Sequence, residues 1–308
     1  MAFFSSNRTP VVWVTGAGGL IGAALVRKAV DCVPGWRVSG IIRADLDLAD
    51  DAELERRLQA DRPDLIVHCA CLTRAPQCEV QPELARRLNV EVTRRLADWS
   101  GQHGAVLAFF STDLLFDGTQ GWYAETDLPN PRGIYAQTKR EGEIAALAYP
   151  GHLVIRSTLT YGKSPTGDRS FHEDMLRSVR EGRRPRLFTD EFRCPIPVEE
   201  TARATWELLV GLAGHSSSGR PSGIFHIAGA DRLSRWEIGT LVAEVHPELR
   251  GQLDPSSIRD YQGPPRPADC SMRCDRIQPW LSRPLPGFRD WIRARVSPSR
   301  SGDRGIGS

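Results

Sequence analysis

The 308-residue sequence predicts an α/β protein: a doubly wound parallel sheet followed by a smaller C-terminal lobe. Over the first 156 residues, short apolar runs alternate with helical patterns. Such alternation implies right-handed crossovers between parallel strands. After about residue 157, proline and glycine become denser and irregular segments join the helices. This change of rhythm indicates a second, smaller lobe that is partly interleaved with the sheet.

The expected strands are hydrophobic throughout, not alternately polar, which indicates burial on both faces. In chain order we expect strands at 11–15, 36–42, 64–69, 105–110 and 152–156. We expect helices at 20–30, 51–60, 83–100, 134–148, 169–181, 199–212 and 235–245. We therefore expect a dinucleotide-binding domain over 10–156 and a smaller substrate-binding lobe over 157–296. The Ser-, Gly- and Arg-rich tail over 297–308 is expected to be disordered.

Composition excludes several classes of protein. The 40 basic and 38 acidic residues are interspersed, so no concentrated basic face for nucleic acid is expected. No run approaches 18 uncharged apolar residues, and the N-terminus lacks the apolar core of a signal peptide. The seven cysteines form no CxxC pair, which favours reduced thiols in the cytoplasm. Cys270 and Cys274 lack a second pair of ligands, so no metal is expected.

A glycine-rich turn, TGAGGLIG at 15–22, follows the first expected strand. In this spacing Gly16 permits the tight turn, Gly19 lets the backbone approach a pyrophosphate and Gly22 lets the helix pack closely. The phosphate would then meet the free N–H groups at the start of the helix. A bare glycine motif also suits a flexible turn, but its place between a buried strand and an apolar helix predicts a Rossmann-type dinucleotide site.

The end of the second strand indicates which dinucleotide is bound. Arg43 follows Ile41 and Ile42, where an arginine suits a 2′-phosphate, so NADP(H) is preferred. Asp45 is close by, and an acidic residue there would instead hold a ribose hydroxyl. The sequence therefore also allows NAD(H) as the cofactor.

Tyr135 and Lys139 lie four residues apart on an expected helix and share one face. A close ammonium would lower the pKa of the tyrosine from its ordinary ~10 and let it exchange a proton with a carbonyl oxygen. The spacing alone also fits an exposed helical pair. The fourth strand ends in Ser111, Thr112 and Asp113, which could cap a turn or bind a substrate carbonyl at the sheet's carboxyl edge. Together these features predict hydride transfer between a nicotinamide cofactor and a carbonyl.

These residues resemble the extended short-chain dehydrogenase/reductase superfamily, and within it the dTDP-4-dehydrorhamnose reductases and their relatives. The resemblance covers residues 10–296. Its markers are TGAGGLIG at 15–22, DLDLAD at 45–50, PDLIVHCA at 63–70, LNVEVTRRLA at 88–97, FFSTDLLFDG at 109–118, ETDLPNPRGIYAQTKREGE at 125–143, VIRSTLTYG at 154–162 and GIFHIAGADRLSRWEIG at 223–239.

The resemblance implies roles for individual residues. The implied catalytic set is Thr112, Tyr135 and Lys139, with Asp113 beside it. The implied cofactor residues are Gly16, Gly19, Leu20, Ile21 and Gly22 at the pyrophosphate, Asp47 and Leu48 at the adenine, Cys69, Ala70 and Cys71 at the ribose, Arg74 at a phosphate and Asn89 behind the site. Tyr135 and Lys139 also face the nicotinamide ribose in this scheme.

Two departures from the sugar reductases concern the substrate. Leu114 stands where they usually carry Tyr, and Leu159 where they often carry Trp. Aromatic faces suit sugar rings, so these changes weaken the expectation of a deoxysugar substrate. Leu114 also cannot exchange a proton, which argues against the sugar dehydratases of the superfamily.

The leading expectation is an NADPH-dependent ketoreductase that acts on the 4-keto group of a nucleotide-linked deoxysugar or on a related polar ketone. One alternative is an NADP-binding regulatory subunit, because VHCA followed by Arg74, and the LNV segment, also resemble the β-subunit of methionine adenosyltransferase. A nucleotide-sugar epimerase is the other. A small-molecule substrate is the expected partner, and helices on the outer faces of the sheet could pair into a homodimer.

Overall fold

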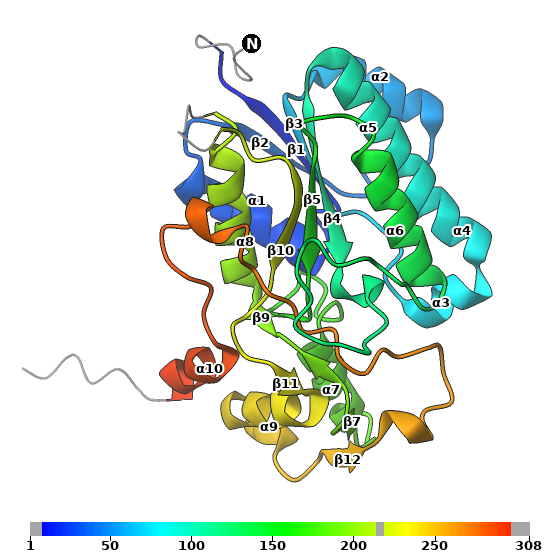
Figure 1. Ribbon diagram of the computed structural model, residues 1–308, viewed down its shortest axis with the longest axis vertical. Coiled ribbons are helices and arrows are strands. Elements are labelled where there is room, and N and C mark those ends of the chain that lie inside the picture. Colours follow the sequence, from blue (N-terminus) through cyan, green and yellow to red (C-terminus); the bar gives the residue numbers. More distant parts are fainter. Residues whose placement is uncertain (1–7, 214–218, 297–308) are drawn as a thin grey trace, which may run out of the picture.

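The computed structural model describes residues 8–213 and 219–296, and its centre is a six-stranded sheet (Figure 1). The strand order is β10-β5-β4-β3-β1-β2, and every neighbouring pair is parallel. The strands are β1 (Val11–Thr15), β2 (Arg37–Ile41), β3 (Leu65–His68), β4 (Val106–Thr112), β5 (Leu153–Ser157) and β10 (Gly223–Ile227). The predicted doubly wound parallel sheet is thus confirmed.

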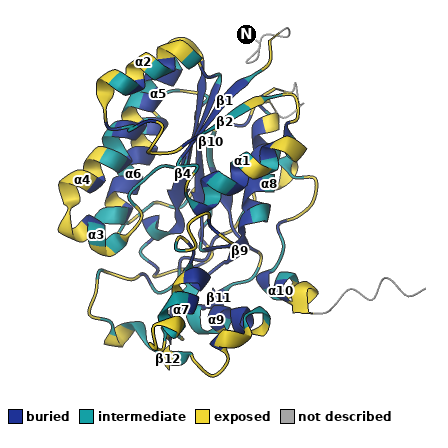
Figure 2. Ribbon diagram, turned by 180° about the vertical axis from the view of Figure 1, so that it is seen from behind, coloured by how far each residue is buried: buried dark blue, intermediate teal, exposed yellow. Residues whose placement is uncertain are grey.

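Helices cover both faces of the sheet (Figure 1). On one face lie α1 (Leu20–Cys32) and α8 (Val198–Val210), and on the other lie α2 (Asp51–Asp61), α5 (Val92–His103) and α6 (Ile134–Ala146). The strands are buried while the helices expose their outer sides (Figure 2). Each face therefore has its own apolar core, as the continuous hydrophobicity of the strands predicts.

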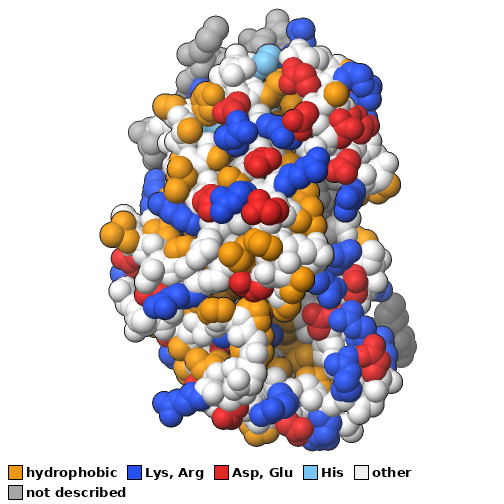
Figure 3. Space-filling model, turned by 90° about the vertical axis from the view of Figure 1, so that its right-hand side faces the viewer, with side chains coloured by type: hydrophobic (Ala, Val, Ile, Leu, Met, Phe, Trp, Pro, Cys, Tyr) orange, Lys and Arg blue, Asp and Glu red, His pale blue; other side chains and the backbone are white. Residues whose placement is uncertain are grey.

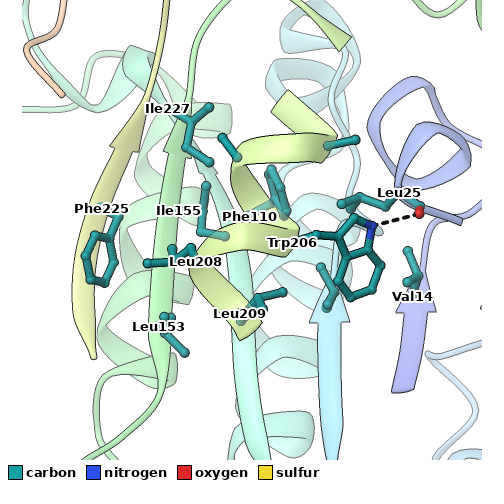
Figure 4. Close-up of a cluster of buried hydrophobic side chains, with 14 of the residues drawn as sticks. Val14, Leu25, Phe110, Leu153, Ile155, Trp206, Leu208, Leu209, Phe225 and Ile227 are labelled. Carbon is teal, nitrogen blue, oxygen red and sulfur yellow. Dashed lines mark hydrogen bonds between the residues drawn. The ribbon is translucent and has the colours of Figure 1, made fainter. Parts of the chain in front are cut away.

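Trp206 joins the second half of the chain to the first (Figure 4). It lies on α8, is fully buried, and its indole N–H donates to the carbonyl of Leu25 on α1 at 2.9 Å. The ring of Trp36 meets it edge-on, with centroids 6.3 Å apart. Because β10 and α8 both follow residue 157, the sheet and its cover include residues from both halves of the sequence.

The smaller lobe lies below the carboxyl edge of the sheet in Figure 1. Its helices are α7 (Phe171–Arg180), α9 (Arg235–Val245) and α10 (Phe288–Val296). Its short strand pairs are β6 (Thr160–Tyr161) with β9 (Ile196–Pro197), β7 (Arg186–Phe188) with β12 (Asp254–Ser256), and β8 (Phe192–Arg193) with β11 (Leu233–Ser234). A third apolar cluster, which includes Tyr161 and Phe288, forms the core of this lobe.

Two elements differ from the sequence-based expectation in ways that affect the site. The expected helix at 83–100 is divided into α4 (Pro82–Arg86), a π-helical turn (Arg87–Glu91) and α5, preceded by the short α3 (Ala75–Val80). Strand β4 extends to Thr112, two residues beyond the expected end. Helix α10 was not expected, and the tail at 297–308 lies outside the described residues. Within 8–213 and 219–296, every helix is too short or too polar to cross a membrane.

Candidate active site

The glycine-rich turn is packed directly against the end of β3. Gly16 has a φ of +69°, and a Cβ added there would lie 2.7 Å from the nitrogen of Ala70. A Cβ at Gly22 would lie 2.4 Å from the carbonyl oxygen of Gly16, while the Gly19 N–H donates to that same oxygen at 2.9 Å. Larger residues would force the turn away from β3. The turn lies where the chain switches sides, between β1 and β3, which is the ligand crevice of such sheets.

The start of α1 is open to an anion. Gly19 is the N-cap and offers no side-chain cap, so the first N–H groups of α1 stay available. Leu20 and Ile21 turn their side chains into the core and leave their backbone at this helix start. The turn thus has the shape and the free donors that a pyrophosphate requires.

Cys69, Ala70 and Cys71 follow β3, where the resemblance places the cofactor ribose. The Ala70 N–H donates to the Thr15 hydroxyl at 3.3 Å, and that hydroxyl bonds to Nδ1 of His68 at 2.7 Å. Burial lowers the pKa of His68 to about 3, so the imidazole is neutral. This network ties β1 to β3 immediately below the crevice.

The adenosine side of the crevice is polar. Arg43 is 83% exposed and its guanidinium lies 3.6 Å from the carboxylate of Asp47, which also accepts the Ala49 N–H. Leu48 packs against the core beside them. A hollow of about 590 Å³ adjoins Asp47 and contains both carboxylates and guanidinium groups. An exposed ion pair of this kind is weak, which leaves Arg43 free to meet a phosphate.

Two buried hydroxyl groups at the carboxyl ends of β4 and β5 have no hydrogen-bond partner among the described residues. They belong to Ser111 and Ser157, which are 8% and 5% exposed. Buried polar groups without partners are rare, and a polar ligand commonly explains them. Together with the glycine turn, they show that this edge fits a dinucleotide cofactor.

Lys139 lies on α6 and points under the end of β4. Its Nζ donates to the carbonyl of Phe110 at 2.6 Å and lies 4.0 Å from the centroid of the Phe109 ring. The residue is 2% exposed, and burial lowers the pKa of its ammonium. Its position at the carboxyl edge is therefore fixed by the sheet itself.

Tyr135 lies one turn before Lys139, with its hydroxyl near the side chain of Thr112. The Thr112 hydroxyl donates to Asp113 at 3.1 Å. The sequence-based expectation that Lys139 lowers the pKa of Tyr135 is wrong for this structure. Burial raises the pKa of Tyr135, as does the nearby Cys71, and the ammonium of Lys139 is bound to Phe110 instead. Tyr135 is consequently a protonated donor.

Asp113 is held by residues from three other segments. Besides Thr112, it accepts a hydrogen bond from Thr158 at 2.9 Å and lies 3.6 Å from Nε of the buried Arg193. Burial raises the pKa of its carboxyl group, while Arg193 and the two threonines oppose that rise. The sequence analysis missed Thr158, although it lies within the VIRSTLTYG marker, and it missed Arg193, because their contacts with Asp113 form only in the folded chain.

Asn89 lies in the π-helical turn and clamps the loop after β3. Its Oδ1 accepts the Leu72 N–H at 2.7 Å, and its Nδ2 donates to the Leu72 carbonyl at 3.2 Å and to the Thr138 hydroxyl at 3.1 Å. π-Helical turns occur frequently at functional sites. Asn89 thereby connects the loop of Cys71 to the residue before Lys139.

Other residues singled out in the sequence lie around this edge. Arg74 is exposed on the loop after β3 and lies 3.6 Å from Asp168 of the lobe. Leu114 and Leu159 are partly buried in separate apolar clusters. Figure 3 shows the neighbouring face of the molecule, hollowed between its upper and lower parts, with hydrophobic side chains in the hollow.

The parallel sheet, the glycine turn and the set of Thr112, Tyr135 and Lys139 define a Rossmann-type protein of the short-chain dehydrogenase/reductase class. The family model described as RmlD substrate binding domain matches residues 11–300. The chain belongs to this family.

The chain is similar both to methionine adenosyltransferase subunits and to reductases, as their names describe them. The methionine adenosyltransferase 2 subunit beta of Xenopus laevis is 29% identical, covering 92% of this chain and 86% of that protein. The dTDP-4-dehydrorhamnose reductase of Sinorhizobium fredii is 28% identical, covering 92% and 95%. A solved dTDP-4-dehydrorhamnose reductase from Bacillus anthracis, in complex with NADP, has a TM-score of 0.82 at 22% identity and covers 93% of this chain and 98% of that one.

The Asn89 clamp yields a prediction. Asn89→Ala removes both bonds to Leu72, so we expect the free energy of unfolding to fall by about 1–3 kcal/mol. Hydrogen exchange at the Leu72 amide should also become faster. Gln262→Ala, at an exposed amide side chain, is the control and should cost about 0.5 kcal/mol or less. Unchanged exchange at Leu72 in Asn89→Ala would contradict the clamp.

Proposed function

We propose that the protein is an NADPH-dependent ketoreductase that reduces the 4-keto group of a nucleotide-linked deoxysugar or a related polar ketone. The observation that carries the proposal is that Tyr135, Thr112 and Lys139 come together at the carboxyl edge of the sheet, beside the glycine turn. A protonated phenol and a hydroxyl that meet there can together bind one carbonyl oxygen. The reductase name of the Sinorhizobium fredii relative supports the same reaction class.

When bound, the reduced nicotinamide supplies the hydride. The glycine turn and the start of α1 would hold the pyrophosphate, and Cys69, Ala70 and Cys71 would lie along the ribose. Two basic residues could bind a 2′-phosphate: Arg43, and Arg74 on the loop after β3. Their presence supports NADP(H) over NAD(H).

The protein's own side chains would then bind and protonate the carbonyl oxygen of the substrate. When the substrate binds, the Thr112 hydroxyl would turn from Asp113 to the carbonyl oxygen and orient it. Tyr135 would give its phenolic proton to that oxygen as the carbonyl carbon accepts the hydride. Lys139 is fixed by Phe110 beneath the site, where its ammonium would bind the nicotinamide ribose. The product is the alcohol, and the proton returns to Tyr135 from solvent.

A second candidate is an NADP-binding regulatory subunit. The methionine adenosyltransferase β-subunits favour it, because their resemblance extends over most of both chains. The retained Thr112, Tyr135 and Lys139 support the enzyme instead. Co-purification of a stoichiometric partner protein, without ketone reduction, would favour a regulatory subunit. Turnover of a nucleotide sugar without net NADPH consumption would favour an epimerase.

The Tyr135→Phe variant tests the proposal. It removes the proton donor and keeps the ring, so kcat for ketone reduction should fall by about 10²–10⁴-fold while NADPH fluorescence still reports binding. Tyr149→Phe is the matched control, since Tyr149 lies on the far side of α6 near His152 and should leave kcat unchanged. An unaltered rate in Tyr135→Phe would refute the assigned role.

The pH dependence follows from the raised pKa of Tyr135. Reduction needs the protonated phenol, so its kcat should stay flat between about pH 7 and about pH 9, because the group loses its proton only above that range. Oxidation of the product alcohol needs the phenolate and should accelerate with rising pH. Initial rates in both directions provide the measurement, and a tenfold decline of reduction per pH unit above neutrality would contradict this assignment.

A further inference from the structure

A loop of the smaller lobe, residues 162–168, reaches both sides of the crevice between β1 and β3. It begins directly after β6, and a Cβ added to Gly162 would lie 3.5 Å from Cδ1 of Leu20, the first residue of α1. This end of the loop therefore lies beside the glycine turn. At its other end, the carboxylate of Asp168 lies 3.6 Å from the guanidinium of Arg74, on the segment after β3. The strand order of the sheet reverses between these two contacts.

The two sides of the crevice belong to opposite faces of the sheet. Leu20 packs into the apolar core that α1 and α8 cover. Arg74 is the N-cap of α3, which packs against α6 on the other face. A loop that reaches both residues must pass over the carboxyl edge of the sheet, where the glycine turn meets the segment after β3. The 162–168 loop therefore crosses the crevice that we assign to the dinucleotide.

The loop is held to its own lobe by the buried Glu173 of α7. One carboxylate oxygen of Glu173 accepts the backbone N–H of Ser164 at 2.7 Å. The other accepts the Ser164 hydroxyl at 2.7 Å and the backbone N–H of Arg169 at 2.9 Å. The Ser164 oxygen in turn accepts the Gly167 N–H at 3.0 Å. These bonds fold the loop into a compact unit and present Asp168 toward the sheet.

The ion pair across the crevice is weak by comparison. The side chains of Arg74 and Asp168 are 54% and 34% exposed. A hydrogen bond from Thr166, with the charges of Arg169 and Arg74, holds the pKa of the Asp168 carboxyl below its usual range, so the pair is ionised at neutral pH. Exposed pairs of this kind contribute little to stability. The contact can therefore open and close while the lobe and the sheet stay folded.

We propose that Arg74 and Asp168 form a latch that holds the 162–168 loop across the crevice and gates the passage of the dinucleotide. The inference rests on the cofactor site of the proposed function, and it applies equally to a reductase and to a cofactor-binding subunit. The closed loop obstructs the crevice, so the cofactor enters and leaves through the open form. Because the pair closes in the same way over the empty and the occupied crevice, it slows entry and release by one factor and leaves the affinity unchanged.

The test is stopped-flow fluorescence of NADPH binding to the full chain. The association rate constant comes from the concentration dependence of the observed rate, and the dissociation rate constant from a chase with excess NADP⁺. In Asp168→Asn both rate constants should rise by about 2- to 5-fold, the range that an exposed ion pair supports, while their ratio, Kd, stays the same. NADH lacks the 2′-phosphate and should show the same rise, because the latch does not depend on that group.

Two further variants complete the test. Asp168→Glu keeps the carboxylate and should bring both rates back toward the wild-type values. Glu181→Gln removes an exposed carboxylate from the same lobe and should match the wild type.

The outcomes that would overturn the latch are distinct. Unchanged rates in Asp168→Asn would refute it. Faster release alone, with weaker binding, would show that Asp168 or its loop contacts the cofactor instead. Faster entry alone, confined to NADPH and with tighter binding, would show that Asp168 withholds Arg74 from the 2′-phosphate. A wild-type protein that binds neither NADPH nor NADH would overturn the cofactor site itself, and the latch with it.

Discussion

The close approach of Gly16 to Ala70 is the constraint on which the rest of the site depends. With 2.7 Å between a hypothetical Cβ at Gly16 and the Ala70 nitrogen, the turn after β1 can follow only one path, across the end of β3. That path places the start of α1 between the ends of β1 and β3, which is where the strand order of the sheet reverses. The Thr15–His68 bond and the Ala70 N–H stabilise the same junction from below.

The carboxyl edge of the sheet is also joined to the smaller lobe by buried charge. Asp113 accepts from Thr112 and Thr158 and lies against Arg193, which in turn contacts Glu191. Removing one member would leave a buried charge without compensation, which is far more costly than an exposed pair. This network therefore fixes the lobe relative to the hydroxyl of Thr112.

Much of the fold could be predicted from the sequence, because strand burial and helix periodicity are local signals. Five strands of the sheet and the place of the glycine turn follow from runs such as 11–15 and 64–69, whereas the sixth strand, β10, was not among the strands expected from such runs. The π-helical turn at Asn89 could not be predicted, because a single π-helical turn within a helix carries no residue-type signal of its own. Thr158 and Arg193 meet Asp113 only in three dimensions. The pKa of Tyr135 was predicted in the wrong direction because burial cannot be read from an i, i+4 spacing.

The central claim is that this carboxyl edge transfers a hydride to a ketone. The most direct measurement is the loss of NADPH absorbance in the presence of a dTDP-4-dehydro-6-deoxyhexose, with the fluorescence of bound NADPH recorded in the same cuvette. The account predicts enhanced fluorescence on binding and oxidation of one NADPH for each ketone reduced. A protein that binds neither NADPH nor NADH would contradict the account at its first step, the glycine turn.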